Sequence, residues 1–527
     1  MQAASINLYS LLQAQAEAHP HAAALIDCTR RAAVTMDFAA FDDAVARAAA
    51  FLLRHGLKAG DPVLLFHPMS ADLYVALGAI FRLGLVGVFI DPSLGSEHLA
   101  QCCTLTSPKA LLATPKAHLL RLVAPALRRI PLKFATGIGA PGAIAWRRYT
   151  REEPLRSIAP VARETPALVT FTSGSTGTPK AAVRTHGFLR SQHAVVEATL
   201  QTEPGEIILT TLPIFVLSHL AAGATTLIPS VDIRHPGKVE PAPVTAQIRR
   251  FGVDCIEASP AFLERVAEHC MATGERLDGV QKIFAGGGPV FPHLLDALRG
   301  VASNAEVEAV YGSTEAEPIA HLSVHDIRSA DRRAMQQGAG LLAGRRVDAV
   351  DLRLLQDRWG TVIPSLNRAE FDAACLPAGE IGEIVVHGDH VLAGYLHGVG
   401  NAETKFKVDE QVWHRTGDAG AFDSEGRLWL MGRCQAKVVD ERGALYPFAA
   451  EVAAQQHPAV RRAALVQHAG KRVLVVEFKH GRPVERIHAL LDWAQVDTVR
   501  AIKRIPVDRR HNAKIDYKAL QAIFQDD

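Results

Sequence analysis

The chain has 527 residues, more than one hydrophobic core usually organises, so at least two domains are expected. Its 57 basic and 55 acidic residues leave a formal charge of +2, which by itself predicts neither a nucleic-acid partner nor a membrane-surface partner. The seven cysteines show no CxxC and no Cys/His spacing suited to zinc, so reduced thiols are expected. The N-terminal segment lacks a basic region followed by an apolar run, and a cytoplasmic location is therefore expected.

From residue 7 to about residue 92, segments of helical periodicity alternate with short apolar runs. The most apolar stretch, residues 73–90, contains Arg82 and two helix-weakening glycines, so it is expected to form a buried helix and a buried strand rather than a membrane span. Further apolar runs between residues 110 and 315 are spaced widely enough for crossover helices. This rhythm predicts α/β layers built on parallel sheets.

After about residue 345 the pattern becomes strand-rich, and the block from residue 435 to the end has strands and helices of its own. The predicted fold is α/β: a large N-terminal domain of parallel-sheet layers with a β subdomain, followed by a small mobile α+β C-terminal domain. We place the boundary between the two domains, residues 1–432 and residues 433–527, at residues 432–433.

The first chemical signal is the run FTSGSTGTPK at residues 171–180, which follows the apolar run ALVT. A strand that leads into small hydroxyl residues, glycines and a lysine brings backbone N–H groups, hydroxyls and one positive charge to a polyphosphate. The spacing from Gly174 through Gly177 to Lys180 differs from that of the GxxxxGK[ST] P-loop. A flexible linker is the alternative, but a linker would not follow a buried strand.

This run resembles the TSGSTGxPKG signature of the adenylate-forming superfamily, which includes acyl-CoA synthetases, luciferases and peptide-synthetase adenylation domains; Ala181 stands where the last glycine is usual. The resemblance covers nearly the whole chain, because further motifs follow in the family's order. It implies that ATP and Mg²⁺ are cofactors, that a small-molecule carboxylic acid is the partner, and that acyl-AMP forms with release of pyrophosphate. No nucleic acid and no integral membrane segment are expected, and the oligomeric state stays open.

By that resemblance the run FAGGGP at residues 284–289 borders the adenine, which glycines allow to approach closely. In VYGSTE at residues 310–315, Tyr311 is expected to stack on adenine, Thr314 to bond a phosphate and Glu315 to hold Mg²⁺. In WHRTGD, Asp418 is expected to accept both ribose hydroxyls. Residues 423–433 resemble DxxGxLxxxGR, in which Arg433 assists at the ribose or phosphate.

The C-terminal run PVDRRHNAK places Lys514 where the superfamily has a catalytic lysine, which neutralises charge developing between carboxylate and α-phosphate. The residues expected to act in catalysis are Thr172, Lys180, Glu315 and Lys514. The residues expected to bind ATP are Thr172, Ser173, Gly174, Ser175, Thr176, Gly177, Lys180, Gly286, Gly287, Gly288, Pro289, Tyr311, Gly312, Ser313, Thr314, Asp418 and Arg433. Asp423 and Arg427, by contrast, are expected to form a hairpin with a surface salt bridge.

The acid pocket is expected among residues 213–229, 257–260 and 286–313, with the candidates Phe215, Val216, His219 and Gly287. The apolar character of residues 214–220 favours a fatty or other apolar acid. The sequence offers no acidic anchor for an α-amino group, which disfavours free amino acids.

The chain departs from acyl-CoA synthetases at two segments. PIFV replaces PxFH at residues 213–216, and the hinge segment has Gln435 and Ala449 where acidic or basic residues are usual. In CoA-using relatives the hinge region helps to form the pantetheine tunnel, so CoA use stays open. The same departures resemble the β-lactone synthetases of the bacterial olefin pathway, whose activated acid is attacked by its own 3-hydroxyl. A fatty or aryl acid:CoA ligase and a non-catalytic nucleotide-binding homologue are the alternatives.

Overall fold

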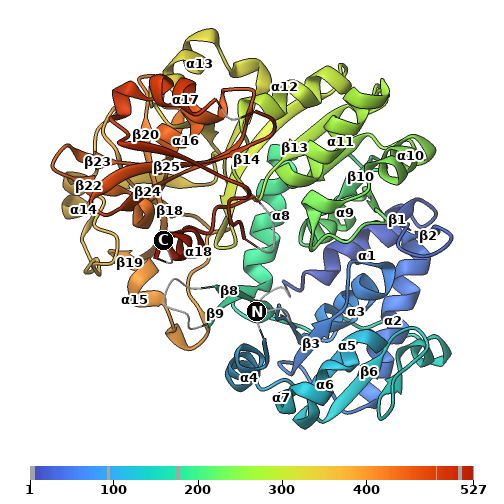
Figure 1. Ribbon diagram of the computed structural model, residues 1–527. Helices are drawn as coiled ribbons and strands as arrows, with labels where there is room; N and C mark the ends of the chain where they lie inside the picture. The colour runs from blue at the N-terminus through green and yellow to red at the C-terminus, as the bar shows by residue number, and fades with distance from the viewer. Residues whose placement is uncertain (1–5, 92–94, 174–178, 482, 509–512, 526–527) are drawn as a thin grey trace. The chain divides into compact units, whose positions relative to one another are not determined.

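The computed structural model describes residues 6–91, 95–173, 179–481, 483–508 and 513–525. The chain forms two compact units, each drawn in Figure 1. Unit 1 comprises Met1–Ser230 and Asp389–Ala402, and unit 2 comprises Val231–Gly388 and Glu403–Asp527. The expected domain boundary at residues 432–433 falls within unit 2 and stays a prediction.

Unit 1 contains a seven-stranded sheet in which six neighbouring strands run parallel and the last pair, β8–β9, is antiparallel. Its order is β7 (Ile144–Ala145), β6 (Leu132–Ala135), β5 (Ala110–Ala113), β3 (Pro62–Phe66), β4 (Val86–Phe89), β8 (Pro166–Ser173) and β9 (Pro179–Thr185). A second ladder of the unit joins β10 (Ile207–Thr210), β11 (Thr225–Ile228), β1 (Ala23–Asp27) and β2 (Val34–Asp37). The parallel strands and intervening helices confirm the predicted α/β layers.

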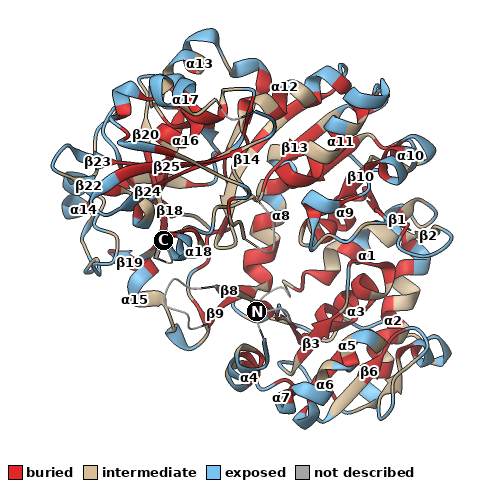
Figure 2. Ribbon diagram, in the orientation of Figure 1, coloured by how far each residue is buried: buried red, intermediate tan, exposed pale blue. Residues whose placement is uncertain are grey.

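Most helices of unit 1 bury part or nearly all of their surface, as the burial colours of Figure 2 show. They are α1 (Tyr9–Ala18), α2 (Phe38–Arg54), α3 (Ala71–Arg82), α4 (Gly95–Thr106), α5 (Pro115–His118), α6 (Leu120–Val123), α7 (Pro125–Arg129), α8 (His186–Leu200) and α9 (Phe215–Ala222). Side-chain caps fix several starts: Asp37 accepts from the N–H of Ala40, and Thr185 accepts from the N–H of Phe188.

The apolar stretch at residues 73–90 forms the buried helix and strand that its pattern predicts, α3 and β4. Arg82 is fully buried at the end of α3, and its guanidinium donates to Asp42 Oδ1 at 2.9 Å and to the carbonyl of Ser157 at 3.2 Å. A buried guanidinium needs such partners, because an unpaired charge in the interior is costly. None of the described helices is both long and apolar enough to cross a membrane.

Unit 2 contains a long mixed sheet whose parallel part, β12–β13–β14, leads into antiparallel strands. From that end the order is β12 (Cys255–Ala258), β13 (Lys282–Ala285), β14 (Glu306–Ser313), β15 (Ala316–Ser323), β16 (Leu341–Arg346), β21 (Leu428–Arg433), β20 (Gln411–Phe422), β18 (Gly382–His387) and β17 (Asp351–Leu355), with β19 (Lys405–Val408) paired to β20. The antiparallel half is the β-rich region predicted after residue 345.

The remaining elements of unit 2 are a hairpin, a three-stranded sheet and eight described helices. The strands are β22 (Val438–Asp440), β23 (Gly443–Leu445), β24 (Val460–His468), β25 (Lys471–Phe478) and β26 (Thr498–Ile502). The helices are α10 (Pro241–Phe251), α11 (Pro260–Thr273), α12 (Pro292–Val301), α13 (Ser329–Gln336), α14 (Arg368–Ala374), α16 (Pro447–Gln455), α17 (Val484–Leu490) and α18 (Tyr517–Gln525), and α15 (Asn401–Thr404) spans the boundary of the two units.

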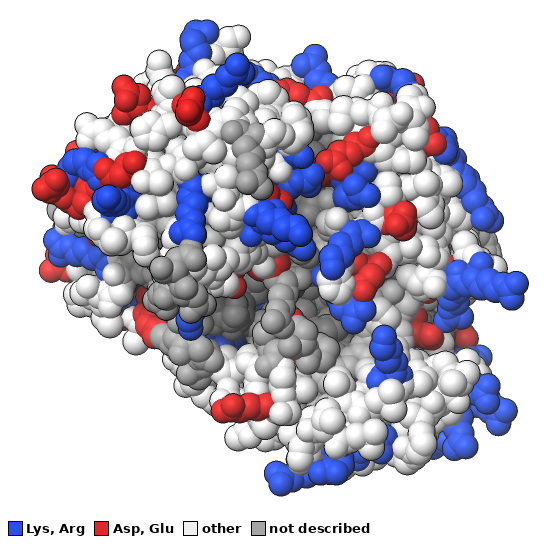
Figure 3. Space-filling view, in the orientation of Figure 1, with Lys and Arg blue, Asp and Glu red and all other residues white. Residues whose placement is uncertain are grey.

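One hairpin holds a buried ion pair where the sequence predicts a surface pair. Acidic and basic side chains are interspersed over much of the face drawn in Figure 3, as the near-zero net charge leads one to expect. The Asp423–Arg427 pair, however, is not a surface pair: Arg427 is buried and also donates to both oxygens of Asp331, at 2.7 and 3.0 Å. Turn periodicity predicted the pair, but the second carboxylate comes from α13, far away in the sequence.

Candidate active site

The predicted phosphate loop connects β8 and β9 in unit 1. The two strands pair in antiparallel register, with Thr172 opposite Lys180 and Ser173 opposite Pro179. Gly174, Ser175, Thr176 and Gly177 lie outside the described residues. Lys180 is buried, and its side chain lies against Gly400, where a Cβ atom would come within 2.6 Å of Lys180 Cδ. Glycine at this position therefore leaves room for the lysine stem at the base of the loop.

In unit 2 the glycine segment after β13 lies against the segment that carries Lys514. A Cβ atom on Gly288 would stand 2.6 Å from the Cβ of Ala513, closer than two such atoms come in proteins. Gly286 and Gly287 precede it, and Gly287 has the left-handed φ of +83° that favours glycine. The absence of a side chain at Gly288 thus allows Lys514 and the predicted adenine segment to approach each other.

Tyr311, Asp418 and Arg433 come together, although Tyr311 is 107 residues from Asp418 in the sequence. The Tyr311 hydroxyl donates to Asp418 Oδ2 at 2.9 Å, and Arg433 Nε lies 3.1 Å from Asp418 Oδ1. Asp418 and Arg433 are also directly paired across β20 and β21. The structure therefore brings three residues with predicted roles in nucleotide binding into one hydrogen-bonded group.

The electrostatic environment fixes the protonation states of Tyr311 and Arg433. Burial, assisted by Asp418, raises the pKa of Tyr311 well above its ordinary value, so the phenol stays neutral and donates its hydrogen bond. The negative charge of Asp418 raises the pKa of Arg433 despite the opposing effect of burial. A neutral phenol and a guanidinium hold the carboxylate in one orientation, which suits a side chain that is expected to accept two hydroxyl hydrogen bonds.

Glu315 lies in the turn of the β14–β15 hairpin, where its N–H donates to Ser313 Oγ at 3.2 Å. Lys405, the residue after Thr404 at the start of β19, is near enough to interact electrostatically with Glu315. Burial lowers the pKa of Lys405 to about 7, and Glu315 opposes that shift. Sequence analysis did not select Lys405. Its only signal in the sequence is its position directly after Thr404.

Lys514 is half-buried in the segment before α18. Asp508 Oδ1 accepts the backbone N–H groups of Ala513 and Lys514, at 3.1 and 2.9 Å, which fixes the backbone of Lys514 relative to Asp508. Burial lowers the pKa of Lys514, Arg433 lowers it further, and Asp418 opposes the shift. The electrostatic interactions with Arg433 and Asp418 place the Lys514 ammonium in the same neighbourhood as the Tyr311 group.

A small pocket in unit 1 lies between α8 and α9. Its wall is mostly apolar and contains three polar side chains. It is lined by Leu8, Leu189, Gln192, His193, Val196, Ile214, Phe215, Leu217 and Ser218. Of the predicted acid-pocket residues of α9, Phe215 lines this pocket, whereas Val216 and His219 are fully buried in the packing of the unit and do not line it. His219 Nδ1 lies 3.0 Å from Thr226 Oγ1.

The polar part of the pocket wall contains a paired histidine and serine. His193 Nδ1 lies 2.8 Å from Ser218 Oγ, and His193 Nε2 lies 3.6 Å from a carboxylate oxygen of Glu197. Burial lowers the pKa of His193, although Glu197 raises it. At neutral pH the imidazole is therefore uncharged, and the pocket offers hydrogen-bonding atoms without a net charge.

The chain matches the family of AMP-binding enzymes over residues 12–396. It therefore belongs to the AMP-binding, adenylate-forming family. Olefin β-lactone synthetases from Xanthomonas campestris pv. campestris and Stenotrophomonas maltophilia are each 31% identical to it, over 523 and 514 residues; both matches cover 92% of this chain, and they cover 90% and 91% of those proteins. A feruloyl-CoA synthase from Amycolatopsis sp is 26% identical over 461 residues, which cover 86% of this chain and 84% of that protein.

Solved structures share the fold over almost the whole chain. ATP-bound MatB from Rhodopseudomonas palustris superposes with a TM-score of 0.81 at 20% identity, covering 99% of each chain. The anthranilate CoA ligase AuaEII in complex with anthranoyl-AMP gives a TM-score of 0.82 at 18% identity, covering 99% of this chain and 98% of the other. At these identities the likeness establishes the fold alone, and it confirms the predicted fold class.

The chain is an AMP-forming acid ligase of the ATP-binding, adenylate-forming kind, and this family acts on small-molecule carboxylic acids. The predicted class of reaction, formation of an acyl-AMP from ATP and an acid, is confirmed. The likeness to β-lactone synthetases confirms the resemblance predicted from the hinge and loop segments.

Proposed function

We propose that this chain activates a long-chain 3-hydroxy acid as its acyl-AMP and then closes the activated acid to a β-lactone without CoA. The observation that carries the proposal is the 31% identity, over nearly the full length, to the two olefin β-lactone synthetases. The side chains that line the small pocket between α8 and α9 are mostly apolar, which favours an acid with an alkyl chain, and the neutral polar atoms of His193 and Ser218 beside them suit a hydroxyl group.

The residues take the following roles in this proposal. Residues 433–527 act as a mobile lid over the nucleotide site. Asp418, held by Tyr311 and Arg433, accepts the two ribose hydroxyls, and the Tyr311 ring stacks on adenine. Gly286 to Pro289 border the base, Gly312 to Thr314 border the phosphates, and the loop from Thr172 to Lys180 holds the polyphosphate.

The side-chain oxygen ligands that unit 2 offers fit a magnesium ion that is bound mainly by the phosphates of the substrate. Among the described residues there is no cluster of three or more His, Cys, Asp or Glu side chains that would form a metal site made of protein alone. Mg²⁺ in nucleotide enzymes is bound through one or two carboxylates together with phosphate oxygens and water, which matches the single carboxylate of Glu315. When bound, the ion would neutralise phosphate charge, and Lys405 interacts electrostatically with the Glu315 carboxylate.

In the first step a carboxylate oxygen of the acid attacks the α-phosphorus of ATP. A new phosphorus–oxygen bond forms, the bond between the α-phosphorus and the bridging oxygen breaks, and pyrophosphate leaves with the electron pair. Lys514 stabilises the negative charge that builds up on the α-phosphate, and Lys180 stabilises the leaving pyrophosphate. No nucleophilic side chain is required.

In the second step the 3-hydroxyl oxygen attacks the acyl carbon of the acyl-AMP. The carbon–oxygen bond to the phosphate breaks, AMP leaves as an anion, and the hydroxyl proton passes to a base or to solvent. Because hydroxyl and carbonyl belong to one molecule, the step gains the advantage of an intramolecular reaction. The protein has only to hold the two groups close and keep water out.

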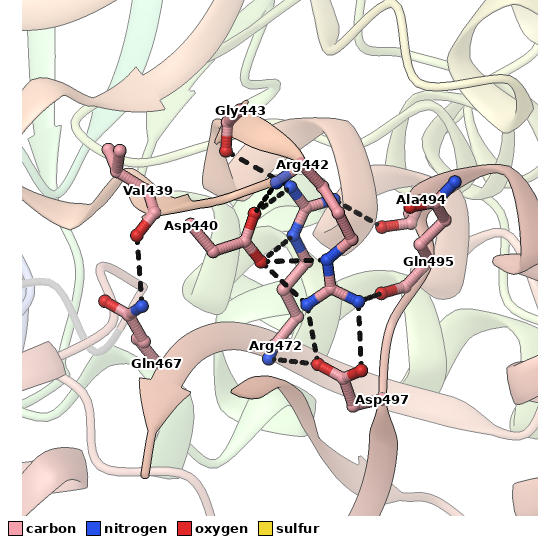
Figure 4. A network of polar contacts seen from close by, with 9 residues as sticks. All are labelled: Val439, Asp440, Arg442, Gly443, Gln467, Arg472, Ala494, Gln495 and Asp497. Atoms are coloured by element: carbon pink, nitrogen blue, oxygen red, sulfur yellow. Dashed lines mark hydrogen bonds and ion pairs between the residues drawn. The ribbon is translucent and has the colours of Figure 1, made fainter. Parts of the chain in front are cut away.

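The hinge region supports a reaction that does not use CoA. Asp440 and Arg442 of the β22–β23 hairpin pair with each other at 2.7 Å, Arg442 also pairs with Asp497 at 2.8 Å, and Arg472 pairs with Asp440 at 2.8 Å, as Figure 4 shows. In CoA-using relatives this region helps to form the pantetheine tunnel. Side chains committed to one another are poorly placed to bind the cofactor's polar arm.

The test is to incubate the enzyme with ATP, Mg²⁺ and a 2-alkyl-3-hydroxy fatty acid, with and without CoA. The expected products without CoA are pyrophosphate, AMP and a compound with the mass of the acid less one water. The matched acid without the 3-hydroxyl should give pyrophosphate and acyl-AMP but no lactone. A thioester that forms only when CoA is present would instead support an acid:CoA ligase, as the feruloyl-CoA synthase relative suggests. The cytoplasmic location stays a prediction.

A further inference from the structure

One stretch of unit 1 has a charge distribution unlike that of the whole chain. Between Glu97 and Glu152 the sequence contains nine lysines and arginines and no aspartate or glutamate, whereas the chain as a whole is nearly balanced. This stretch includes β5, β6 and β7, which form one side of the seven-stranded sheet, together with α5, α6 and α7. The segment therefore carries a local positive charge that the net charge of +2 conceals.

Two loops of this stretch lie side by side at one edge of the sheet. The α5–α6 segment follows β5, and residues 136–143 follow β6; because β5 and β6 are parallel neighbours, both loops leave the same edge. Arg121 joins them, since its guanidinium donates to the carbonyl of Pro141 at 3.0 Å. The imidazole of His118 lies 3.0 Å from the carbonyl of Phe134 and anchors α5 to β6.

Four aliphatic side chains project from these loops into solvent. Leu119, Leu122 and Val123 are 61%, 74% and 68% exposed, and Ile138 on the neighbouring loop is 98% exposed. Single exposed aliphatic residues are common, but four of them on two joined loops form a patch that folding alone does not explain. Such patches mark surfaces that bind a partner.

The basic residues around the patch are exposed as well. Lys116 lies on α5, and Arg128 and Arg129 lie at the end of α7; within the described part of the chain none of the three forms an ion pair with an acidic side chain. The charged side chains visible at the bottom of Figure 3, in the region where Figure 1 places α6, α7 and β6, are basic. Aliphatic side chains thus project from a surface of uncompensated positive charge.

We propose that this face, formed by Leu119, Leu122, Val123, Ile138, Arg128 and Arg129, docks on the surface of an anionic phospholipid bilayer. Aliphatic side chains inserted among the acyl chains and arginines paired with lipid phosphates are the two contacts of a peripheral membrane protein. Nucleic acid would use the positive charge but not the aliphatic side chains. Peripheral docking requires no membrane-spanning helix.

Docking would also orient the sheet. The phosphate loop leaves the same edge as these loops, because β8 runs parallel to β4, and β8 is four strands from β6 in the order of the sheet. At about 4.8 Å per strand the two points are about 19 Å apart along this edge. If the acid is apolar, as the proposed function holds, it partitions into the bilayer close to the loop that binds ATP. The docking itself does not depend on the identity of the acid.

The experiment is a flotation assay of the full-length protein with vesicles of phosphatidylcholine, alone or mixed with phosphatidylglycerol. We expect binding to the anionic vesicles that weakens as salt is raised, and little binding to phosphatidylcholine alone. Arg128→Gln with Arg129→Gln should weaken binding about thirtyfold, since each basic residue near an anionic surface contributes about 1 kcal/mol. Leu119→Ser with Leu122→Ser should weaken it at least about tenfold.

The matched control is Arg299→Gln with Arg333→Gln, two exposed arginines on α12 and α13, which should bind vesicles like the wild type. All variants should keep the wild-type rate of pyrophosphate release with a water-soluble acid, which separates docking from catalysis. Three outcomes would overturn the proposal: no binding to anionic vesicles at low salt, equal binding to neutral vesicles, or loss of binding that is the same in the control pair. Binding to an acidic polypeptide but not to vesicles would assign the face to a protein partner instead.

Discussion

Replacement of Gly288 by alanine gives the sharpest test of how Lys514 is positioned. The new Cβ would stand 2.6 Å from the Cβ of Ala513, whereas carbon atoms in contact lie about 3.5–4.0 Å apart. The segment must therefore move by about 1 Å, and a displacement of that size at a reacting group costs about a hundredfold in rate. We expect pyrophosphate release to slow by about that factor while the protein stays folded.

The distances around Gly288 also define a rescue variant and a control variant. In the double variant with Ala513→Gly, the nearest remaining atoms are Ala513 Cα and Pro260 Cδ, both at 3.9 Å, so most of the lost rate should return. Gly300→Ala on α12 meets nothing within 4 Å and should leave the rate unchanged. The assay is the initial rate of pyrophosphate release under saturating ATP. A double variant as slow as Gly288→Ala alone would refute the argument.

Three further predictions concern charge. Lys514→Ala should slow pyrophosphate release by about 10²–10³-fold, because it removes a charge that acts on the transition state; an unchanged rate would exclude the role. Arg415→Met should lower the free energy of unfolding by about 3–5 kcal/mol in a urea titration, because it leaves the fully buried Glu383, now 2.6 Å from Arg415, without its partner; a change below about 1 kcal/mol would contradict this. Burial raises the pKa of Glu451 to about 7, so the folded chain binds this proton more tightly than the unfolded chain and loses stability as pH rises from about 4.5 to about 7. Glu451→Gln keeps an acceptor for Tyr517, and its free energy of unfolding should exceed that of the wild type by up to about 3 kcal/mol as the pH rises across that window. A difference in the free energy of unfolding that does not vary with pH would refute the prediction.

The motifs could be selected from the sequence because they lie within or directly after strands, where glycines and small polar residues have a recognisable pattern. It found Tyr311, Asp418 and Arg433 one by one, but it gave no sign that the Tyr311 hydroxyl would bond Asp418. That contact depends on how β14 lies relative to β20 in the sheet, which local patterns do not specify. Long-range contacts of this kind appear only with the fold.

The pocket between α8 and α9 shows a second limit. The run PIFVLSHLA is apolar apart from Ser218 and His219, which are adjacent, so its periodicity does not reveal which face of the helix meets the cavity. In the structure Phe215 and Ser218, three residues apart on α9, line the pocket, while Val216 and His219 face the interior. Lys405 was missed for a related reason: a lysine beside a turn is usually solvated, and only the packing of β19 buries it.

The most direct test of the central claim is to follow the oxygen atoms of the acid. A 2-alkyl-3-hydroxy acid labelled with ¹⁸O in both carboxylate oxygens is incubated with the enzyme, ATP and Mg²⁺ in the absence of CoA. The masses of the products are then measured by mass spectrometry. If the carboxylate attacks the α-phosphorus and the 3-hydroxyl then displaces AMP, AMP carries one ¹⁸O and the β-lactone retains the other. AMP without label, or a lactone that retains both labelled oxygens, would contradict the account.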